Sequence, residues 1–245
     1  MYIIGDIHGC LETLKILYKK IPDKKNIYSV GDIIDKGPDS ALVIDFIIKN
    51  NIKVIKGNHE ALYEIMIEKY LNNEDIFYSK WYKLWGGKNT LNSYFKYEKK
   101  IIKKKMIEHL QFIKSLPYYF EIDIKDEDND TLFISHGFAL PYYKMRHNLY
   151  NDNNVKQAFL SNRLKSKYFI VNKKNLKNLE KYKVKNIFGH DASNEVRFSK
   201  NYIAIDTGCV YSKNENKGKC LTAIHWPSKE IIQVKLKDKI NYKDY

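Results

Sequence analysis

Short apolar runs that each end at a polar or glycine cluster recur along the chain and limit how it can fold. These runs are three to five residues long and rich in Ile and Val, which is typical of buried β-strands. Helical spacing occurs instead at Leu11–Lys20, Ser40–Asn50 and Glu60–Leu71. The alternation of strands and helices predicts β-α-β units and therefore an α/β fold. The six runs are Tyr2–Ile4, Ile27–Val30, Ile52–Ile55, Leu132–Ile134, Val184–Phe188 and Tyr202–Ile205.

The stretch 72–116 departs from this alternation. It carries Trp81 and Trp85 and continues into a lysine-rich helical segment, so we interpret it as a helical insertion or cap. Two later runs, Cys220–Trp226 and Glu230–Leu236, alternate weakly and predict a β-hairpin that closes the sheet. A chain of 245 residues suffices for one large α/β domain, and no linker interrupts it, so we expect a single domain over residues 1–245.

The distribution of apolar residues and cysteines indicates a cellular compartment. No apolar run approaches the roughly 20 residues that a membrane-spanning helix needs, and the N-terminal residues lack the basic segment and cleavage site of a leader. The cysteines Cys10, Cys209 and Cys220 form no C-x-x-C pair, and their odd number is typical of a reducing compartment. We therefore expect a cytoplasmic protein with no membrane partner.

The net charge of +14 raises the alternative of a basic nucleic-acid-binding protein. However, the 43 basic residues include only three arginines, Arg146, Arg163 and Arg197, and lysine runs usually lie on solvated helix faces. A nucleic-acid partner is therefore the least favoured of the alternatives. A positive field would also attract anionic phosphate substrates.

Side chains that bind metal ions well follow five of the predicted strands. In α/β sheets, ligands gather at the carboxyl ends of the strands, so these side chains are expected to lie close together. Carboxylate, amide and imidazole groups together form a donor set that suits divalent transition metals. The candidates are Asp6, His8, Asp32, Asn58, His136 and His190.

Three sequence blocks resemble the signature of the calcineurin-like metallophosphoesterases: Gly5-Asp6-Ile7-His8-Gly9, Gly31-Asp32-Ile33-Ile34-Asp35-Lys36-Gly37 and Gly57-Asn58-His59-Glu60. The single blocks His136-Gly137 and Gly189-His190 are similar to those of the phosphoprotein phosphatase branch, which includes bacterial and bacteriophage serine/threonine phosphatases and dinucleoside tetraphosphatases. The nuclease-like branches usually have a second histidine where this chain has Ala192. The resemblance implies a metallophosphoesterase β-sandwich flanked by helices, with residues 72–116 as a small helical cap.

The resemblance also implies a role for each metal-binding candidate. Asp6 and His8 would hold one cation, and Asp32 would bridge it to a second. Two divalent metal ions are expected, Mn²⁺ first, with Fe and Zn as alternatives. A hydroxide that bridges the two metals would attack phosphorus. The second metal site would be completed by Asn58, His136 and His190.

A further set of residues would act on the substrate. His59 is expected to be the general acid for the leaving oxygen, with Asp35 orienting its imidazole. Arg163 would clamp phosphate oxygens, although an ordinary surface arginine is the alternative. Lys36 stands where most phosphoprotein phosphatases carry arginine, and it supplies charge without the bidentate fork. Asn58 is predicted to contact the substrate phosphate as well.

The sequence therefore predicts a dinuclear-metal phosphoesterase. A serine/threonine phosphoprotein phosphatase is the favoured function, because of the block order and Asn162-Arg163. The alternative is a dinucleoside polyphosphate hydrolase acting on diadenosine tetraphosphate, which Lys36 and Asp206-Thr207-Gly208-Cys209 favour. The choice between these substrates stays open at this point, as do the native metal, the oligomeric state and the role of the insertion.

Overall fold

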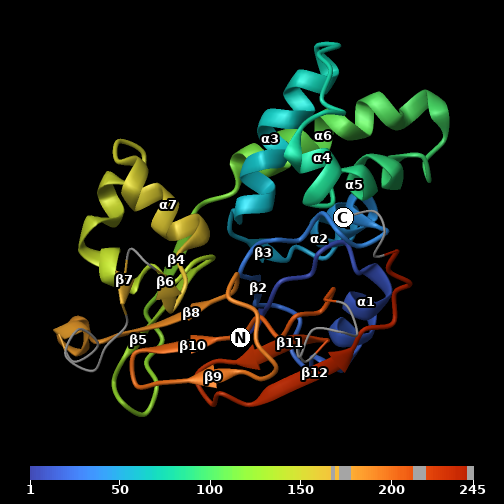
Figure 1. Cartoon of the computed structure of the whole chain (residues 1–245). Helices are drawn as coiled ribbons and strands as arrows, with labels where there is room; N and C mark the ends of the chain where they lie inside the picture. Colours follow the sequence, from blue (N-terminus) through green and yellow to red (C-terminus); the bar gives the residue numbers. More distant parts are fainter. Residues whose placement is uncertain (167–168, 171–177, 212–218, 242–245) are drawn as a thin grey trace.

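The computed structural model is a sandwich of two mixed β-sheets with helices on both outer faces (Figure 1). The structure describes residues 1–166, 169–170, 178–211 and 219–241. The predicted α/β sandwich flanked by helices is confirmed, and each of the six predicted apolar runs overlaps a strand of one of the two large sheets.

In the first sheet, the three N-terminal strands lie parallel, and the predicted C-terminal hairpin adds two antiparallel strands beside them. Because parallel strands end at the same edge of a sheet, the residues that follow them are brought together. The strand order is β12 (Ile231–Lys235), β11 (Cys220–His225), β1 (Tyr2–Ile4), β2 (Ile27–Ser29) and β3 (Lys53–Val54).

The second sheet also has three parallel strands at its centre, with an antiparallel strand at each edge that the run pattern did not predict. A separate two-stranded sheet pairs β6 (Lys165–Ser166) with β7 (Phe169–Ile170). The strand order of the second large sheet is β4 (Tyr119–Ile122), β5 (Thr131–Ser135), β8 (Val184–Phe188), β10 (Tyr202–Ala204) and β9 (Arg197–Phe198).

Hydrophobic side chains from both large sheets form the middle of the sandwich. Ile3 and Ile55 from the first sheet side belong to one buried cluster with Ile134 and Ile187 from the second. The outer faces are covered by α1 (Leu11–Lys20), α2 (Ser40–Lys49) and α3 (Asn58–Leu71) on the first sheet, and by η2 (Leu140–Asn148) and α7 (Asn153–Ser161) on the second.

The segment predicted to be a helical insertion forms a group of helices beside α3. Figure 1 shows this group on the side of the molecule away from α7. Among the described residues, no helix has both the length and the apolar character that crossing a bilayer requires. The cap helices are α4 (Lys80–Leu84), α5 (Gly87–Tyr94), η1 (Lys99–Ile101) and α6 (Ile102–Ser115), and a short helix η3 (Glu180–Tyr182) lies later in the chain.

A polar cluster joins the cap to the body of the protein at Asp45 of α2. Its carboxylate accepts hydrogen bonds from Tyr97 Oη at 2.5 Å, Lys105 Nζ at 2.9 Å and His109 Nε2 at 3.1 Å. Burial acts to raise the pKa of Asp45, but these three hydrogen bonds outweigh it and hold the pKa well below its usual range. The carboxylate therefore stabilises the contact between α2 and α6.

Asp45→Asn is expected to lower the free energy of unfolding at pH 7 by roughly 1 kcal/mol, a small value because the site is partly exposed. A carboxyl group whose pKa is lower in the folded chain contributes stability above its unfolded pKa of about 4, and loses it as the pH falls toward the folded pKa. Urea unfolding from pH 7 downward should therefore show the two proteins converging below about pH 4. Asp123→Asn, at an exposed position, is the control. A constant difference at every pH would contradict this assignment.

Candidate active site

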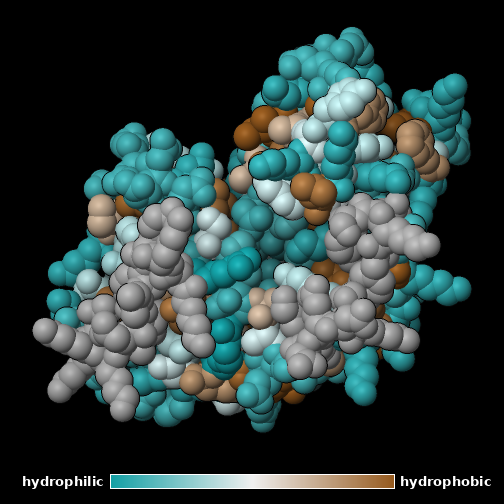
Figure 2. Space-filling model, viewed as in Figure 1, coloured by the Kyte–Doolittle hydropathy of each residue, from teal (hydrophilic) through white to brown (hydrophobic). Residues whose placement is uncertain are grey.

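The residues that follow the parallel strands of both sheets meet in one pocket of about 270 Å³. In Figure 2, hydrophilic surface lies in the hollow between the cap and the α7 side of the molecule. The pocket wall also contains Leu62, Trp85, Asp206 and Tyr211. The predicted site residues in the wall are Asp6, His8, Asp32, Lys36, Asn58, His59, Arg163 and His190.

Asp32 lies at the centre of the site. Its Oδ2 atom is 3.2 Å from His136 Nε2, 3.8 Å from His8 Nε2 and 3.9 Å from His59 Nε2. In this site, two groups of side chains have ligand atoms within 4.8 Å of one another, one with His8 and His59 and one with His136 and His190, and both groups include Asp32. A carboxylate shared by two such groups is the arrangement that a bridging ligand requires.

Backbone carbonyls orient two of the histidines. His8 Nδ1 lies 3.0 Å from the carbonyl oxygen of Ile34, and His136 Nδ1 lies 2.8 Å from that of Val30. Each carbonyl fixes the proton on Nδ1, which leaves Nε2 directed into the site, as in histidines that bind metals. His136 Nε2 is also 3.0 Å from Asn58 Oδ1. Nitrogen and oxygen atoms that can bind a metal ion therefore lie close together beside Asp32.

The electrostatics of the site match a bound cation. Burial and the nearby Asp206 and Asp32 raise the pKa of Asp6 well above its usual value, and burial with Asp32 raises the pKa of Glu60 to about 7. Burial acts against a charged His136, but the Asp32 and Asp6 carboxylates outweigh it and raise the pKa of His136 to about 10. A cation beside Asp6 and Asp32 would offset the cost of burying their negative charge, and the set of carboxylate, amide and imidazole groups fits divalent metal ions.

The carboxylate of Asp6 lies close to the backbone of Gly189 and His190. It accepts hydrogen bonds from the backbone N–H of His190, with Oδ2 at 3.1 Å. A Cβ atom at Gly189 would lie 2.0 Å from Asp6 Oδ1. Only glycine fits there, which is a physical reason for the Gly-His pair that the sequence carries.

Five of the predicted site residues have a left-handed backbone. In non-glycine residues such a conformation costs roughly 1–3 kcal/mol, and it persists where the surrounding structure holds it, often at functional sites. Asp and His adopt this conformation more often than most other non-glycine residues do, but still uncommonly, so the residue types give only a weak signal for it. The residues, with their φ angles, are His8 (48°), Asp32 (48°), Asp35 (68°), Lys36 (64°) and His190 (60°).

Glu60, to which the sequence analysis assigned no role, supports the two loops that carry Asp32 and Gly57. The buried carboxylate accepts hydrogen bonds from the backbone N–H groups of Asp32 at 2.8 Å, Ile33 at 2.9 Å and Gly57 at 2.8 Å. The available signal was its position three residues after Gly57, where the glutamate of a helix capping box occurs. The helix α3 begins at Asn58, two residues earlier than predicted, so Asn58 and His59 lie in its first turn.

His59 and Asp35 form a buried pair. His59 Nδ1 lies 2.7 Å from Asp35 Oδ2, and Asp35 is inaccessible to solvent. The carboxylate therefore faces Nδ1, and Nε2 is turned toward the pocket, 3.9 Å from Asp32 Oδ2. This is the geometry that the predicted general acid and its orienting partner require.

Two cationic side chains and three apolar or aromatic ones complete the wall. Lys36 Nζ lies 2.9 Å from His8 Nε2 and 5.4 Å from the ring centroid of Tyr211. Arg163 lines the same pocket. Trp85 is 41% exposed and lines the pocket, whereas Trp81 is buried. The contributions of Leu62 and Tyr211 could not be predicted, because no local pattern distinguishes them.

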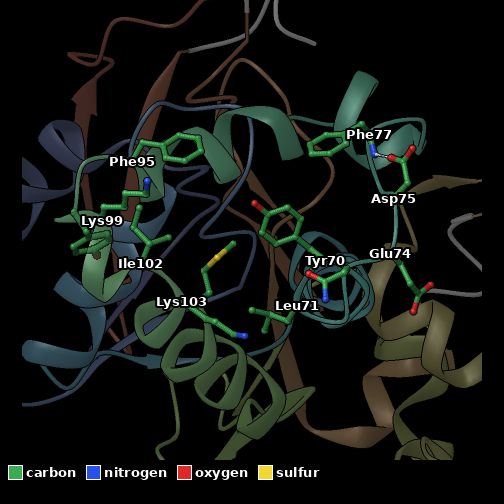
Figure 3. Close-up of a pocket in the computed structure, with 12 residues that line it drawn as sticks. Tyr70, Leu71, Glu74, Asp75, Phe77, Phe95, Lys99, Ile102 and Lys103 are labelled. Carbon is green, nitrogen blue, oxygen red and sulfur yellow. Dashed lines mark hydrogen bonds between the residues drawn. The ribbon is translucent and has the colours of Figure 1, made fainter.

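A second, larger pocket of about 950 Å³ lies between the end of α3 and the cap, and none of the predicted site residues lines it. Figure 3 shows Tyr70, Phe77 and Phe95 around it, with Lys99 and Lys103 on one side and Glu74 and Asp75 on the other. It lacks the convergent metal-binding donors of the strand-end pocket.

Comparison with known protein sequences connects this site to one family. The family model described as calcineurin-like phosphoesterase matches residues 1–194. A relative named bis(5'-nucleosyl)-tetraphosphatase PrpE (asymmetrical), from Anoxybacillus flavithermus, is 25% identical over 95% of this chain and 92% of its own length. A relative of the same name from Oceanobacillus iheyensis is 28% identical over 95% and 90%. A shorter match, 43% identical over 24% of each chain, is to a symmetrical bis(5'-nucleosyl)-tetraphosphatase from Buchnera aphidicola.

Solved structures share the fold. A protein provisionally described as a diadenosine tetraphosphatase superposes with a TM-score of 0.61 at 19% identity, over 95% of this chain and 91% of its own. A metallophosphoesterase from Sphaerobacter thermophilus superposes with a TM-score of 0.52 at 14% identity, over 98% and 90%. At these identities the similarity supports the architecture alone.

Proposed function

Because this chain belongs to the calcineurin-like phosphoesterase family, we propose that it is a metal-dependent hydrolase of dinucleoside tetraphosphates. The relatives that match nearly its whole length support this substrate, which was the alternative in the sequence analysis. The order of the sequence blocks and Asn162-Arg163 favoured a serine/threonine phosphatase. Those blocks, however, determine the hydrolytic chemistry more than the choice of substrate. A phosphoprotein substrate becomes the second candidate.

The observation that carries this proposal is the mixed character of the pocket wall. Lys36 and Arg163 supply positive charge for a phosphate chain, while Trp85 and Tyr211 supply aromatic surface in the same pocket. Stacking of a base on an aromatic side chain contributes roughly 1–3 kcal/mol. A phosphate chain that carries a nucleoside at each end would use both features, whereas a phosphoserine uses only the first.

The metal ligands in this proposal are those that the sequence predicted: Asp6, His8, Asp32, Asn58, His136 and His190. Two divalent cations, Mn²⁺ first, would be held by these residues, and Asp32 belongs to both of the candidate groups. When bound, they supply Lewis-acid stabilisation of the charge that develops on the phosphoryl oxygens.

The remaining residues bind substrate and move a proton. Lys36, Arg163 and Asn58 would hold the phosphate chain, Arg163 with two parallel N–H groups and Lys36 as a point charge. Water adds to one phosphorus and the P–O bond to the bridging oxygen breaks. His59 would donate the proton that the leaving phosphate oxygen takes up, while Asp35 holds the imidazole in place.

Diadenosine tetraphosphate is expected to be hydrolysed in the presence of Mn²⁺ with a kcat/KM roughly tenfold or more above that for a phosphopeptide, since base stacking adds 1–3 kcal/mol. Chromatography of the products identifies the bond that breaks. AMP and ATP are the expected products, because the relatives that match nearly the whole chain are named asymmetrical. Two ADP molecules would indicate symmetrical cleavage.

The variant Trp85→Ala tests whether a base of the substrate stacks on this side chain. It should raise KM for diadenosine tetraphosphate by roughly tenfold, and change the rate on inorganic tripolyphosphate little, because that compound carries no base. Preference for the phosphopeptide by the unmodified protein would replace this proposal with the second candidate.

A further inference from the structure

We propose that the cap is part of the catalytic apparatus, with Trp81 of α4 and Thr90 of α5 as positioning residues that hold Asp35 and, through it, His59. This proposal rests on the proposed function only in taking His59 as the proton donor. It assigns a role to the segment that the sequence left without one.

Hydrogen bonds from the cap reach both oxygens of the Asp35 carboxylate. The indole Nε1 of Trp81 donates to Oδ2 at 2.9 Å, the same oxygen that faces His59 Nδ1 at 2.7 Å. The Thr90 hydroxyl donates to Oδ1 at 2.5 Å. The backbone N–H of Asp35 in turn donates to Ser40 Oγ at 2.9 Å and lies 3.1 Å from Thr90 Oγ1.

The hydrogen bonds around the Asp35 carboxylate are closed to solvent. Asp35 and Thr90 are inaccessible to solvent, and Trp81 is 1% exposed. Because these groups are closed to solvent, water cannot replace a donor that a mutation removes. A buried carboxylate that loses a hydrogen-bond donor then costs free energy. The three side chains that contact the Asp35 carboxylate, His59, Trp81 and Thr90, come from three different helices. Together they fix the plane of the carboxylate. The position of Oδ2 then determines where the His59 ring points.

The cap also contacts the backbone of the loop that carries Asp35. Asn89 Nδ2 donates to the carbonyl oxygen of Lys36 at 2.6 Å. Gly86 has φ +91°, and a Cβ atom there would lie 2.1 Å from the nitrogen of Lys36. These contacts hold the left-handed conformation of Asp35 and Lys36. The cap therefore supports both the orienting carboxylate and the phosphate-binding lysine.

Thr90→Val tests the inference, because valine keeps the shape of threonine and removes the hydroxyl. If Thr90 acts through His59, the loss depends on how much the leaving group needs a proton. Hydrolysis of phenyl phosphate, a poor leaving group, should fall roughly 10- to 100-fold, while hydrolysis of p-nitrophenyl phosphate should fall far less. An equal loss on both esters would show a merely structural role and overturn the proposal.

Two matched variants on α5 accompany it. Thr90→Ser restores a hydroxyl and should recover most of the phenyl phosphate activity. Ser93→Ala removes a buried hydroxyl whose hydrogen bonds go to the backbone of Ala41 and Thr90 instead, and the ratio of rates on the two esters should stay that of the unmodified protein. In a His59→Asn background, Thr90→Val should have no further effect on this ratio. A further full-sized loss there would also overturn the proposal.

A measurement on the metal-free protein separates this inference from the proposed function. In nitrogen-15 NMR of histidine-labelled protein, the Nδ1 proton of His59, assigned by its loss in His59→Asn, should be protected from exchange with water. Thr90→Val and Trp81→Phe should speed that exchange roughly tenfold or more, since the acceptor is no longer fixed, and Ser93→Ala should not. Unchanged exchange in both would overturn the proposal even if no phosphoester is hydrolysed, whereas faster exchange with no hydrolysis would contradict only the proposed function.

Discussion

Asp32→Asn is expected to reduce turnover roughly a thousandfold or more. Asp32 belongs to both of the side-chain groups in the site that could hold a metal ion. Asparagine keeps the shape but removes the negative charge and one of the two oxygens, so it cannot serve two cations. Loss of several kcal/mol of transition-state stabilisation corresponds to this factor.

The fold should survive this substitution. Asp32 Oδ1 accepts the backbone N–H of His59 at 3.1 Å, and an asparagine oxygen can accept the same bond. Steady-state kinetics with excess Mn²⁺, metal content by mass spectrometry and far-UV circular dichroism measure the three consequences. The exposed variant Asp123→Asn should match the unmodified protein in all of them. Undiminished turnover in folded Asp32→Asn protein would refute the central position of this carboxylate.

The metal-binding candidates could be predicted from sequence because each follows a short apolar run. In parallel strands, that position alone brings residues to one edge of the sheet, so Asp6, Asp32 and His190 required no knowledge of side-chain packing. The edge strands β4 and β9 gave no comparable signal. They lie at the sheet margins, where Glu121 and Arg197 interrupt the apolar pattern.

The supporting residues could not be predicted, because their partners are distant in sequence. Trp81 and Thr90 contact Asp35 across 46 and 55 positions, and neither the spacing nor the composition of the cap indicates that contact. The same holds for the aromatic wall of the pocket, to which Trp85 comes from the cap. Sequence patterns thus identified candidate residues that share one pocket, while the arrangement of the cap determines which other side chains surround them.

His59→Asn is expected to lower kcat roughly 10²- to 10⁴-fold, the usual contribution of a positioned general acid, with little change in KM. Asparagine cannot donate a proton to the leaving oxygen, so the loss should be larger for phenyl phosphate than for p-nitrophenyl phosphate. His147→Asn, at an exposed position in η2, is the control and should keep full activity.

The same variant distinguishes two roles for His59, since its ring belongs to one of the groups that could hold a metal ion. The 2.7 Å contact from Nδ1 to Asp35 favours the proton donor, because it fixes the ring and leaves Nε2 for the substrate. A donor can be removed without loss of metal, so His59→Asn should bind as many metal ions as the unmodified protein, measured by mass spectrometry and by calorimetric titration with Mn²⁺. If one equivalent of metal is lost and both phosphate esters slow equally, His59 is a ligand, and the Asp35 carboxylate then orients a metal-binding imidazole rather than an acid.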